Sequence, residues 1–126
     1  MAADRSLSSG LVHWPWLGVV ALDSAAFDVV EIMERRHPRL YDRAFGRDPQ
    51  YWRATSPFHV LRQAPQPILI VCSTRRADSC PPARRFAQGA LALGGRSTVS
   101  ERYLSHREIN ERLGLDGPYT AEVEAF

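Results

Sequence analysis

The sequence predicts an α/β protein of three layers (αβα), in which a parallel sheet is flanked by helices. Two short runs, 17–22 and 68–72, are continuously apolar, a pattern typical of strands buried on both faces of a parallel sheet. A third segment, 97–103, alternates more and carries charges, as an outer strand does. Helical patterns lie between these segments, and the order strand, helix, crossover, strand, helix, strand, helix is that of a parallel α/β sheet.

The first third of the chain supplies one strand and one helix. We expect residues 1–12, which are mostly small and polar, to lack regular structure. After the apolar run 17–22, Ser24 is a candidate N-cap of a helix. Its apolar positions recur on one side, at Phe27, Val30 and Met33. The helix should end before Pro38, because a residue that precedes proline is pushed out of the helical region.

The middle of the chain is predicted to be a crossover followed by a strand and a long helix. Residues 38–67 contain several prolines and short aromatic-rich pieces, which indicate short helices and turns, or part of a cap over a site. After the strand 68–72, Pro81 and Pro82 occupy helix-start positions, the positions that tolerate proline. The buried stripe of this helix is predicted to comprise Phe86, Ala87, Ala90 and Leu91.

Two further helices are predicted after the third strand. Ser105 and Glu108 have the spacing of a capping box, which places His106 in the first turn of a helix that continues to Leu113 and stops at Gly114. A last helical segment, 120–126, has Thr120 as its candidate cap, and Val123 and Phe126 fall on one face.

Length and composition favour one ordinary globular domain of 126 residues. The 16 basic residues are all arginines, stand against 14 acidic residues, and are scattered along the chain, whereas a nucleic-acid interface needs a concentrated basic face. The longest apolar runs are about six residues, far below the roughly twenty that span a bilayer. Because no secretory signal pattern opens the chain, the expected location is the cytoplasm.

Several segments together resemble a known family. These are 21–26 (ALDSAA), 44–49 (AFGRDP), Ser56-Pro57, Asp78 and 105–110 (SHREIN) followed by Leu113-Gly114. On these residues, 19–126 resembles the C-terminal half of the α/β-hydrolase fold, most closely bacterial carboxylesterase-like members. The resemblance implies that 1–126 is the C-terminal portion of a single, partial α/β-hydrolase domain. A Gly-x-Ser-x-Gly nucleophile elbow and a His-Gly-Gly oxyanion loop, both typical of the family, do not occur in this sequence.

The resemblance implies that Asp78 is the acid and His106 the general base of a Ser-His-Asp triad. Both residues follow predicted strands, so both should emerge at the carboxyl edge of the sheet, where open α/β sheets place their ligands. We therefore expect a carboxylate oxygen of Asp78 roughly 2.6–3.2 Å from His106 Nδ1. The alternatives are that Asp78 is a turn residue or a partner of Arg75 or Arg76, and that His106 is a polar helix-start residue.

Ser24 is the local candidate for a nucleophile, because it follows a buried strand and precedes a helix. Its neighbours argue against this role. The nucleophile elbow needs small residues two positions before and two after the serine, and Leu22 occupies the first of these positions.

The function implied by the resemblance is hydrolysis of a small-molecule carboxylic ester through an acyl-serine intermediate, without a cofactor. The chain would supply the acid and the histidine but not the nucleophile, and we expect the isolated chain to be inactive. The alternative is a non-catalytic fragment or subunit that needs a separate N-terminal half. Self-association, or pairing with that half, would use the exposed edge of the strand 17–22.

The spacings of cysteine and histidine do not indicate a metal site. Cys72 and Cys80 match neither a zinc-ligand spacing nor a Cys-x-x-Cys motif, and the histidines form no i,i+4 pair. Two reduced thiols are expected in the cytoplasm. The other possibility is a disulfide that clamps the loop containing Asp78.

Overall fold

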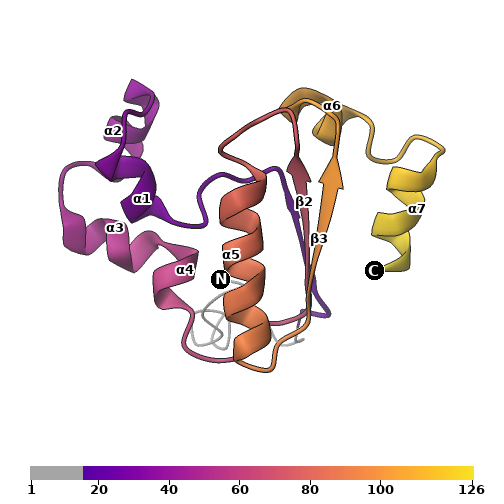
Figure 1. Cartoon of the computed structure of the whole chain (residues 1–126), viewed down its shortest axis with the longest axis horizontal. Coiled ribbons are helices and arrows are strands. Elements are labelled where there is room, and N and C mark those ends of the chain that lie inside the picture. The colour runs from indigo at the N-terminus through magenta and orange to yellow at the C-terminus, as the bar shows by residue number, and fades with distance from the viewer. Residues whose placement is uncertain (1–15) are drawn as a thin grey trace.

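The structure is a computed structural model that describes residues 16–126, so the expectation for residues 1–12 lies outside the described part. Figure 1 shows a small sheet with the long helix α5 on one side and α6 and α7 on the other. In chain order the elements are β1 Val19–Leu22, α1 Val29–Glu34, α2 Arg39–Phe45, α3 Pro49–Thr55, α4 Pro57–Val60, β2 Ile68–Ser73, α5 Cys80–Ala92, β3 Ser97–Arg102, α6 His106–Glu111 and α7 Pro118–Ala125.

The three strands form one parallel sheet in the order β1-β2-β3, as the sequence predicts. Val19 of β1 pairs with Ile68 of β2, which in turn pairs with Ser97 of β3. All six residues of β2 are buried, because this strand lies between the other two and helices cover both of its faces. The α/β class is therefore confirmed, and the three strands end at a common carboxyl edge.

Alternate residues of β2 enter two separate cores, one on each face of the sheet. Ile68, Ile70 and Cys72 pack with Phe27 and Leu61 and against α5 through a cluster completed by Cys80, Ala83, Phe86, Ala87 and Ala90. On the opposite face, Leu69 and Val71 pack against Ile109 of α6 and Tyr119 of α7. This division explains why β2 is apolar without alternation from Ile68 to Cys72.

Three predictions about helix ends and faces are wrong. Ser24 does not cap α1, because the helix begins at Val29 and the Asp28 side chain accepts from Glu31 N; Ser24 Oγ accepts from Ala26 N in a turn instead. Leu91 of α5 is exposed, since it lies on the face turned away from the sheet. The helix containing His106 ends at Glu111 rather than continuing to Leu113.

The prediction of a Thr120 cap is also wrong. Helix α7 already begins at Pro118, and Gly117 is its N-cap. Thr120 is buried within the helix, and its Oγ1 donates to Leu115 O at 2.5 Å while accepting from Gly114 N at 3.1 Å. The hydroxyl therefore closes the α6–α7 loop.

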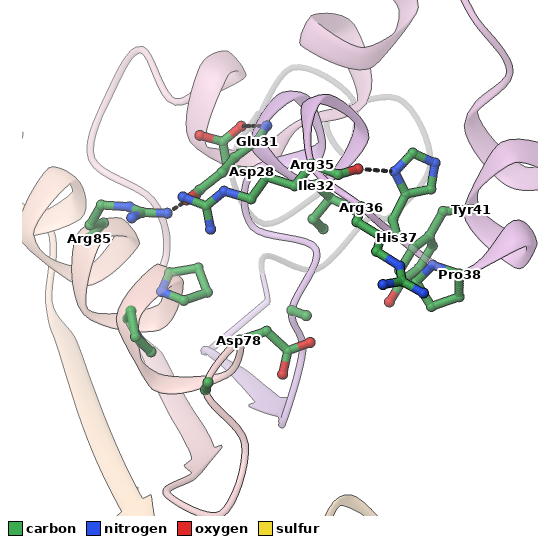
Figure 2. Close-up of a pocket in the computed structure, with 14 residues that line it drawn as sticks. Asp28, Glu31, Ile32, Arg35, Arg36, His37, Pro38, Tyr41, Asp78 and Arg85 are labelled. Atoms are coloured by element: carbon green, nitrogen blue, oxygen red, sulfur yellow. Dashed lines mark hydrogen bonds and ion pairs between the residues drawn. The ribbon is translucent and has the colours of Figure 1, made fainter.

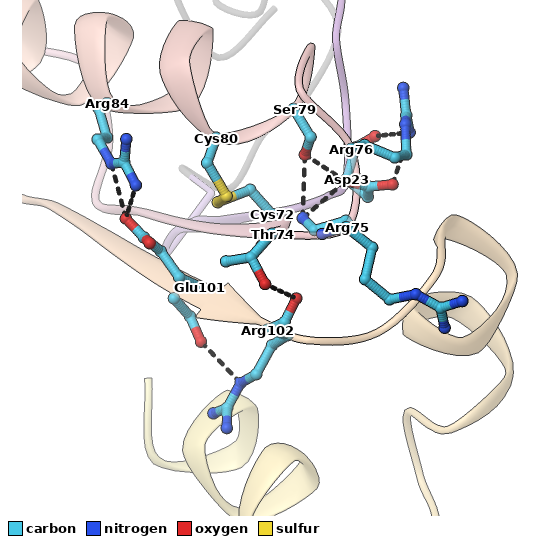
Figure 3. Close-up of a disulfide and its surroundings, with 12 residues drawn as sticks. Asp23, Cys72, Thr74, Arg75, Arg76, Ser79, Cys80, Arg84, Glu101 and Arg102 are labelled. Carbon is cyan, nitrogen blue, oxygen red and sulfur yellow. Dashed lines mark hydrogen bonds and ion pairs between the residues drawn. A yellow bond between two sulfur atoms is a disulfide. The ribbon is translucent and has the colours of Figure 1, made fainter.

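Cys72 and Cys80 form a disulfide, so the expectation of two reduced thiols is wrong and the alternative is correct. Their Cα atoms lie 5.1 Å apart, within the range that a disulfide can join. Cys72 is near the end of β2 and Cys80 is the first residue of α5, so the bond closes the loop between these elements (Figure 3).

None of the helices in residues 16–126 combines the length and the apolar character needed to cross a bilayer.

Candidate active site

Three chain segments meet where the parallel strands end. β1 is followed directly by Asp23, β2 by the loop 74–79, and β3 by the short connection 103–105 that leads into α6. The meeting of these segments is a property of parallel strands, whose carboxyl ends share one edge of the sheet. Asp23, Arg76, Ser79 and His106 come into contact there, although they belong to three separate segments of the chain.

Asp23 is the centre of this cluster. Its side chain is 0% exposed, and its backbone has a φ of 51°, which turns the chain sharply at the end of β1. Oδ1 accepts hydrogen bonds from Ser73 N at 2.9 Å and from Ser79 Oγ. Oδ2 accepts from Arg76 Nη1 at 2.6 Å and from His106 Nδ1 at 2.9 Å. Both oxygens of a fully buried carboxylate are thus satisfied, as burial of a charge requires.

These hydrogen bonds keep Asp23 ionised. Burial by itself raises the pKa of the Asp23 carboxyl, but the hydrogen bonds from Ser79, Ser73 N, His106 and Arg76 outweigh burial and hold the pKa below its ordinary value. The cluster therefore contains a buried carboxylate anion at neutral pH, and that anion faces an imidazole.

His106 is held at the edge of the site by its own helix and by Asp23. The capping box is formed as predicted: Ser105 Oγ accepts from Glu108 N, and Glu108 Oε2 accepts from Ser105 N at 2.8 Å. Since the Asp23 carboxylate can only accept, His106 Nδ1 carries the proton of their shared hydrogen bond. In the neutral imidazole this tautomer leaves Nε2 as the acceptor nitrogen, and the His106 side chain is 60% exposed.

The predicted contact between Asp78 and His106 is wrong. Asp78 lies in the β2–α5 loop, its side chain is 68% exposed, and its two oxygens accept from Arg76 Nε and Nη2, each at 3.2 Å. The alternative partner named for Asp78, Arg76, is therefore the one found. His106 Nδ1 instead contacts Asp23, which is 83 residues away along the chain.

Arg76 connects the two carboxylates. Its side chain reaches Asp78 with Nε and Nη2 and reaches Asp23 with Nη1, which also donates at 3.4 Å to the backbone oxygen of Asp23. Nη1 lies 3.4 Å from His106 Nδ1, but both nitrogens carry hydrogens, so each directs its proton to Asp23 Oδ2. Among residues 16–126, Asp78 thus reaches the site through the guanidinium of Arg76.

One local feature of the sequence could have indicated Asp23 earlier. Asp23 directly follows a predicted apolar strand, as a functional residue of a parallel sheet commonly does. Asp78 likewise lies in the loop that follows the next strand. Both aspartates were reasonable partners for His106. Burial decides between them, because Asp23 is enclosed by the loop 74–79 whereas Asp78 faces solvent.

Hydrogen bonds from His106 to a serine hydroxyl do not occur within residues 16–126. Ser24 Oγ accepts from Ala26 N, Ser73 Oγ donates to Leu104 O, and Ser79 Oγ donates to Asp23. The latter two serines are fully buried and hold the loops in place. Within the described residues, no serine is therefore activated by the imidazole.

A cleft of about 310 Å³ borders the other side of the loop 74–79. Figure 2 shows Asp78 on one side of it and α1 with the following loop on the other. Its walls combine prolines and Tyr41 with charged side chains, of which Glu31 pairs with both Arg35 and Arg85. A hydrogen bond to Asp42 raises the pKa of His37, which also lines this cleft. Neither Asp23 nor His106 lines it.

Comparisons of the chain with protein-family models, curated proteins and solved structures find no match. Within residues 16–126, His, Cys, Asp and Glu side chains do not gather in groups of three that could hold a metal ion.

Proposed function

We propose that this chain carries the acid and base of a serine hydrolase of the carboxylesterase type, with His106 as general base and Asp23, rather than Asp78, as its acid partner. The observation that supports the proposal is the 2.9 Å hydrogen bond between Asp23 and His106 Nδ1 at the carboxyl edge of a parallel sheet. A buried carboxylate on one nitrogen of an exposed imidazole is the arrangement that a hydrolase triad requires.

The pair can perform the proton transfers of ester hydrolysis. His106 Nε2 would accept the proton of a serine hydroxyl as the serine attacks the ester carbonyl, and would then give that proton to the leaving alcohol. Asp23 holds the required tautomer and stabilises the imidazolium that forms between these steps. Its four hydrogen bonds keep it ionised and fixed, so it does not need to move during the reaction.

The nucleophile and the oxyanion donors would come from outside residues 16–126. In this proposal the three parallel strands are the C-terminal part of an α/β-hydrolase sheet. The other strands of that sheet would pair with the free edge of β1. β1 lies at the edge of the described sheet, and Val20 in it is 37% exposed. The partners would be a small-molecule ester and the rest of the hydrolase domain.

The second candidate function is a non-catalytic subunit or fragment that binds its missing half through the same edge of β1. The disulfide bears on where either protein would work. Disulfides persist in oxidising surroundings and are rare in the cytoplasm, so the Cys72–Cys80 bond favours an oxidising location over the cytoplasm predicted from the sequence.

The DNA upstream of the Met1 codon separates the two candidates. An in-frame Gly-x-Ser-x-Gly there would supply the nucleophile elbow, and the longer product should hydrolyse short-chain aryl esters. In that product, Asp23→Asn and His106→Ala should each lower kcat by about 10³-fold or more, whereas the matched variant Asp78→Asn should keep most of the activity. The absence of an upstream elbow, or equal losses for both aspartate variants, would contradict the proposal.

The isolated chain gives a complementary test. It should neither hydrolyse aryl esters above the buffer rate nor react with a fluorophosphonate, since its described part has no activated serine. Stoichiometric labelling of Ser24 would instead make Ser24 the nucleophile of a complete site.

A further inference from the structure

The disulfide lies immediately beside the hydrogen bonds that hold Asp23. Cys72 precedes Ser73, whose backbone N donates to Asp23 Oδ1, and Cys80 follows Ser79, whose hydroxyl donates to the same oxygen. Ser73 N also donates to Ser79 Oγ at 3.0 Å, so the two ends of the loop contact each other as well as Asp23. Figure 3 shows Asp23 and Ser79 beside the disulfide at the start of α5.

The same loop contains Arg76, the donor to the other oxygen of Asp23. Of the four side-chain and backbone groups that donate to Asp23, three therefore belong to the segment closed by the disulfide, and the fourth is His106 itself. The position of the carboxylate that orients His106 depends on the closure of this loop.

Breaking the bond would crowd the core, because two buried thiols need more room than a disulfide. Cys72 is 1% and Cys80 4% exposed, and both pack in the cluster with Ile70, Ala83 and Phe86. Non-bonded sulfur atoms have to lie further apart than bonded ones, and a close-packed core cannot expand around them without shifting its neighbours. Ser79 directly precedes Cys80 at the start of α5, so a shift of this first turn would carry Ser79 away from Asp23.

We propose that the Cys72–Cys80 disulfide is a redox latch on the Asp23–His106 pair: the pair is held in place when the bond is formed and is released when the bond is reduced. That the disulfide regulates catalysis rests on the proposed hydrolase function. That the disulfide holds the loop 74–79 in place does not. In the reduction, a dithiol gives two electrons and two protons, the S–S bond breaks to two thiols, and the dithiol becomes a disulfide.

Burial of the sulfurs makes this latch slow. Thiol–disulfide exchange needs in-line access to a sulfur atom, so a dithiol can act only when the loop opens or before the chain has folded. The redox conditions during folding therefore determine whether the bond is present in the folded chain.

The backbone amide of Ser73 reports directly on the latch, because its hydrogen is shared between Asp23 and Ser79. Hydrogen exchange should be measured on the oxidised chain and on a chain that has been reduced while unfolded and refolded with dithiothreitol. Thiol alkylation verifies the two states. The amides of Val19 and Ile68, bonded to Pro67 O and Arg96 O at the opposite edge of the sheet, are the internal controls.

Reduction should speed exchange at Ser73 by about tenfold or more relative to Val19 and Ile68. A Cys72→Ala, Cys80→Ala chain, which lacks the bond but has no crowded thiols, should show the same direction with a smaller change. Equal exchange at Ser73 in both states would overturn the latch. So would a reduced chain and a double variant in which all three amides lose protection together, since the bond would then hold the whole domain. Hydrogen exchange does not involve ester hydrolysis, so a failure of the proposed function leaves this test unaffected.

Discussion

Replacing Asp23 by Asn should destabilise the protein far more than the same change at Asp78. Asn has one acceptor oxygen and one donor NH₂, whereas both oxygens of Asp23 accept. If the NH₂ takes the place of Oδ2, it faces the donors of Arg76 and His106. If it takes the place of Oδ1, it faces Ser73 N. Either orientation leaves buried donors without an acceptor and removes the counter-charge of Arg76.

The expected magnitudes follow from burial. Removing one partner of a buried, hydrogen-bonded ion pair costs about 3–5 kcal/mol, and the Asp23 side chain is fully buried. Asp78 is largely exposed, so solvent screens its ion pair with Arg76, and its loss should cost about 0–1 kcal/mol. With a urea m-value of about 2 kcal/mol/M, Asp23→Asn lowers the unfolding midpoint by about 2 M and Asp78→Asn by less than about 0.5 M.

Urea unfolding followed by tryptophan fluorescence and circular dichroism measures both variants against the parent chain. Ser79→Ala is a milder companion, because it removes one donor to Asp23 and should cost about 1 kcal/mol. If Asp78→Asn proves as destabilising as Asp23→Asn, or if both are nearly neutral, then Asp23 is not the buried centre of the site and the reasoning fails.

Three further outcomes are expected. Because the pKa of Asp23 is lowered on folding, its contribution to the free energy of unfolding is fully present above its unfolded pKa of about 3.9 and is lost as the pH falls through the lower folded pKa. The difference in the free energy of unfolding between the parent chain and Asp23→Asn should therefore be constant from neutral pH down to about pH 5 and shrink below about pH 4. Ser105→Ala breaks the capping box of α6 and should cost about 1 kcal/mol in the same urea assay, whereas Ser97→Ala removes a buried hydroxyl that has no partner within the described residues and should be neutral or stabilising; a destabilising Ser97→Ala would show that this hydroxyl is satisfied. If the edge of β1 is free in solution, the chain should self-associate in analytical ultracentrifugation, and Val20→Lys should weaken association while the exposed helical control Leu40→Lys should not; a monomeric parent chain would count against a free edge.

The sequence was sufficient for the features that depend on neighbouring residues. The continuous apolar run 68–72 predicted a strand buried on both faces, as β2 is, because such a strand has no place for polar side chains. The same pattern at 17–22 predicted a second fully buried strand, but β1 lies at the edge of the described sheet and is partly exposed. Pro81 and Pro82 marked the start of α5, and Ser105 with Glu108 marked the start of α6, because helix ends are chosen by local hydrogen bonding. These elements also put His106 at the carboxyl edge of the sheet.

Local patterns failed where a neighbouring residue took the predicted role, or where the packing of a helix on the sheet decided which side is covered. Ser24 and Thr120 both have the chemistry of a helix cap, but Asp28 and Gly117 take those positions, and the two hydroxyls bond elsewhere. Leu91 has the spacing of a buried residue, but the apolar residues of α5 cover a broad part of its surface. The orientation of the helix on the sheet therefore decides which of them are buried, and Leu91 is exposed.

The partner of His106 was decided by the tertiary structure alone. Asp23 and Asp78 both follow strands that end at the same edge, so sequence spacing did not distinguish them. The choice depends on which carboxylate the loop 74–79 encloses, and that loop is closed by the disulfide between the end of β2 and the start of α5. The sequence by itself thus determined the elements and the edge at which the site lies, whereas the pairing of Asp23 with His106 across 83 residues arose from burial, which only the folded chain establishes.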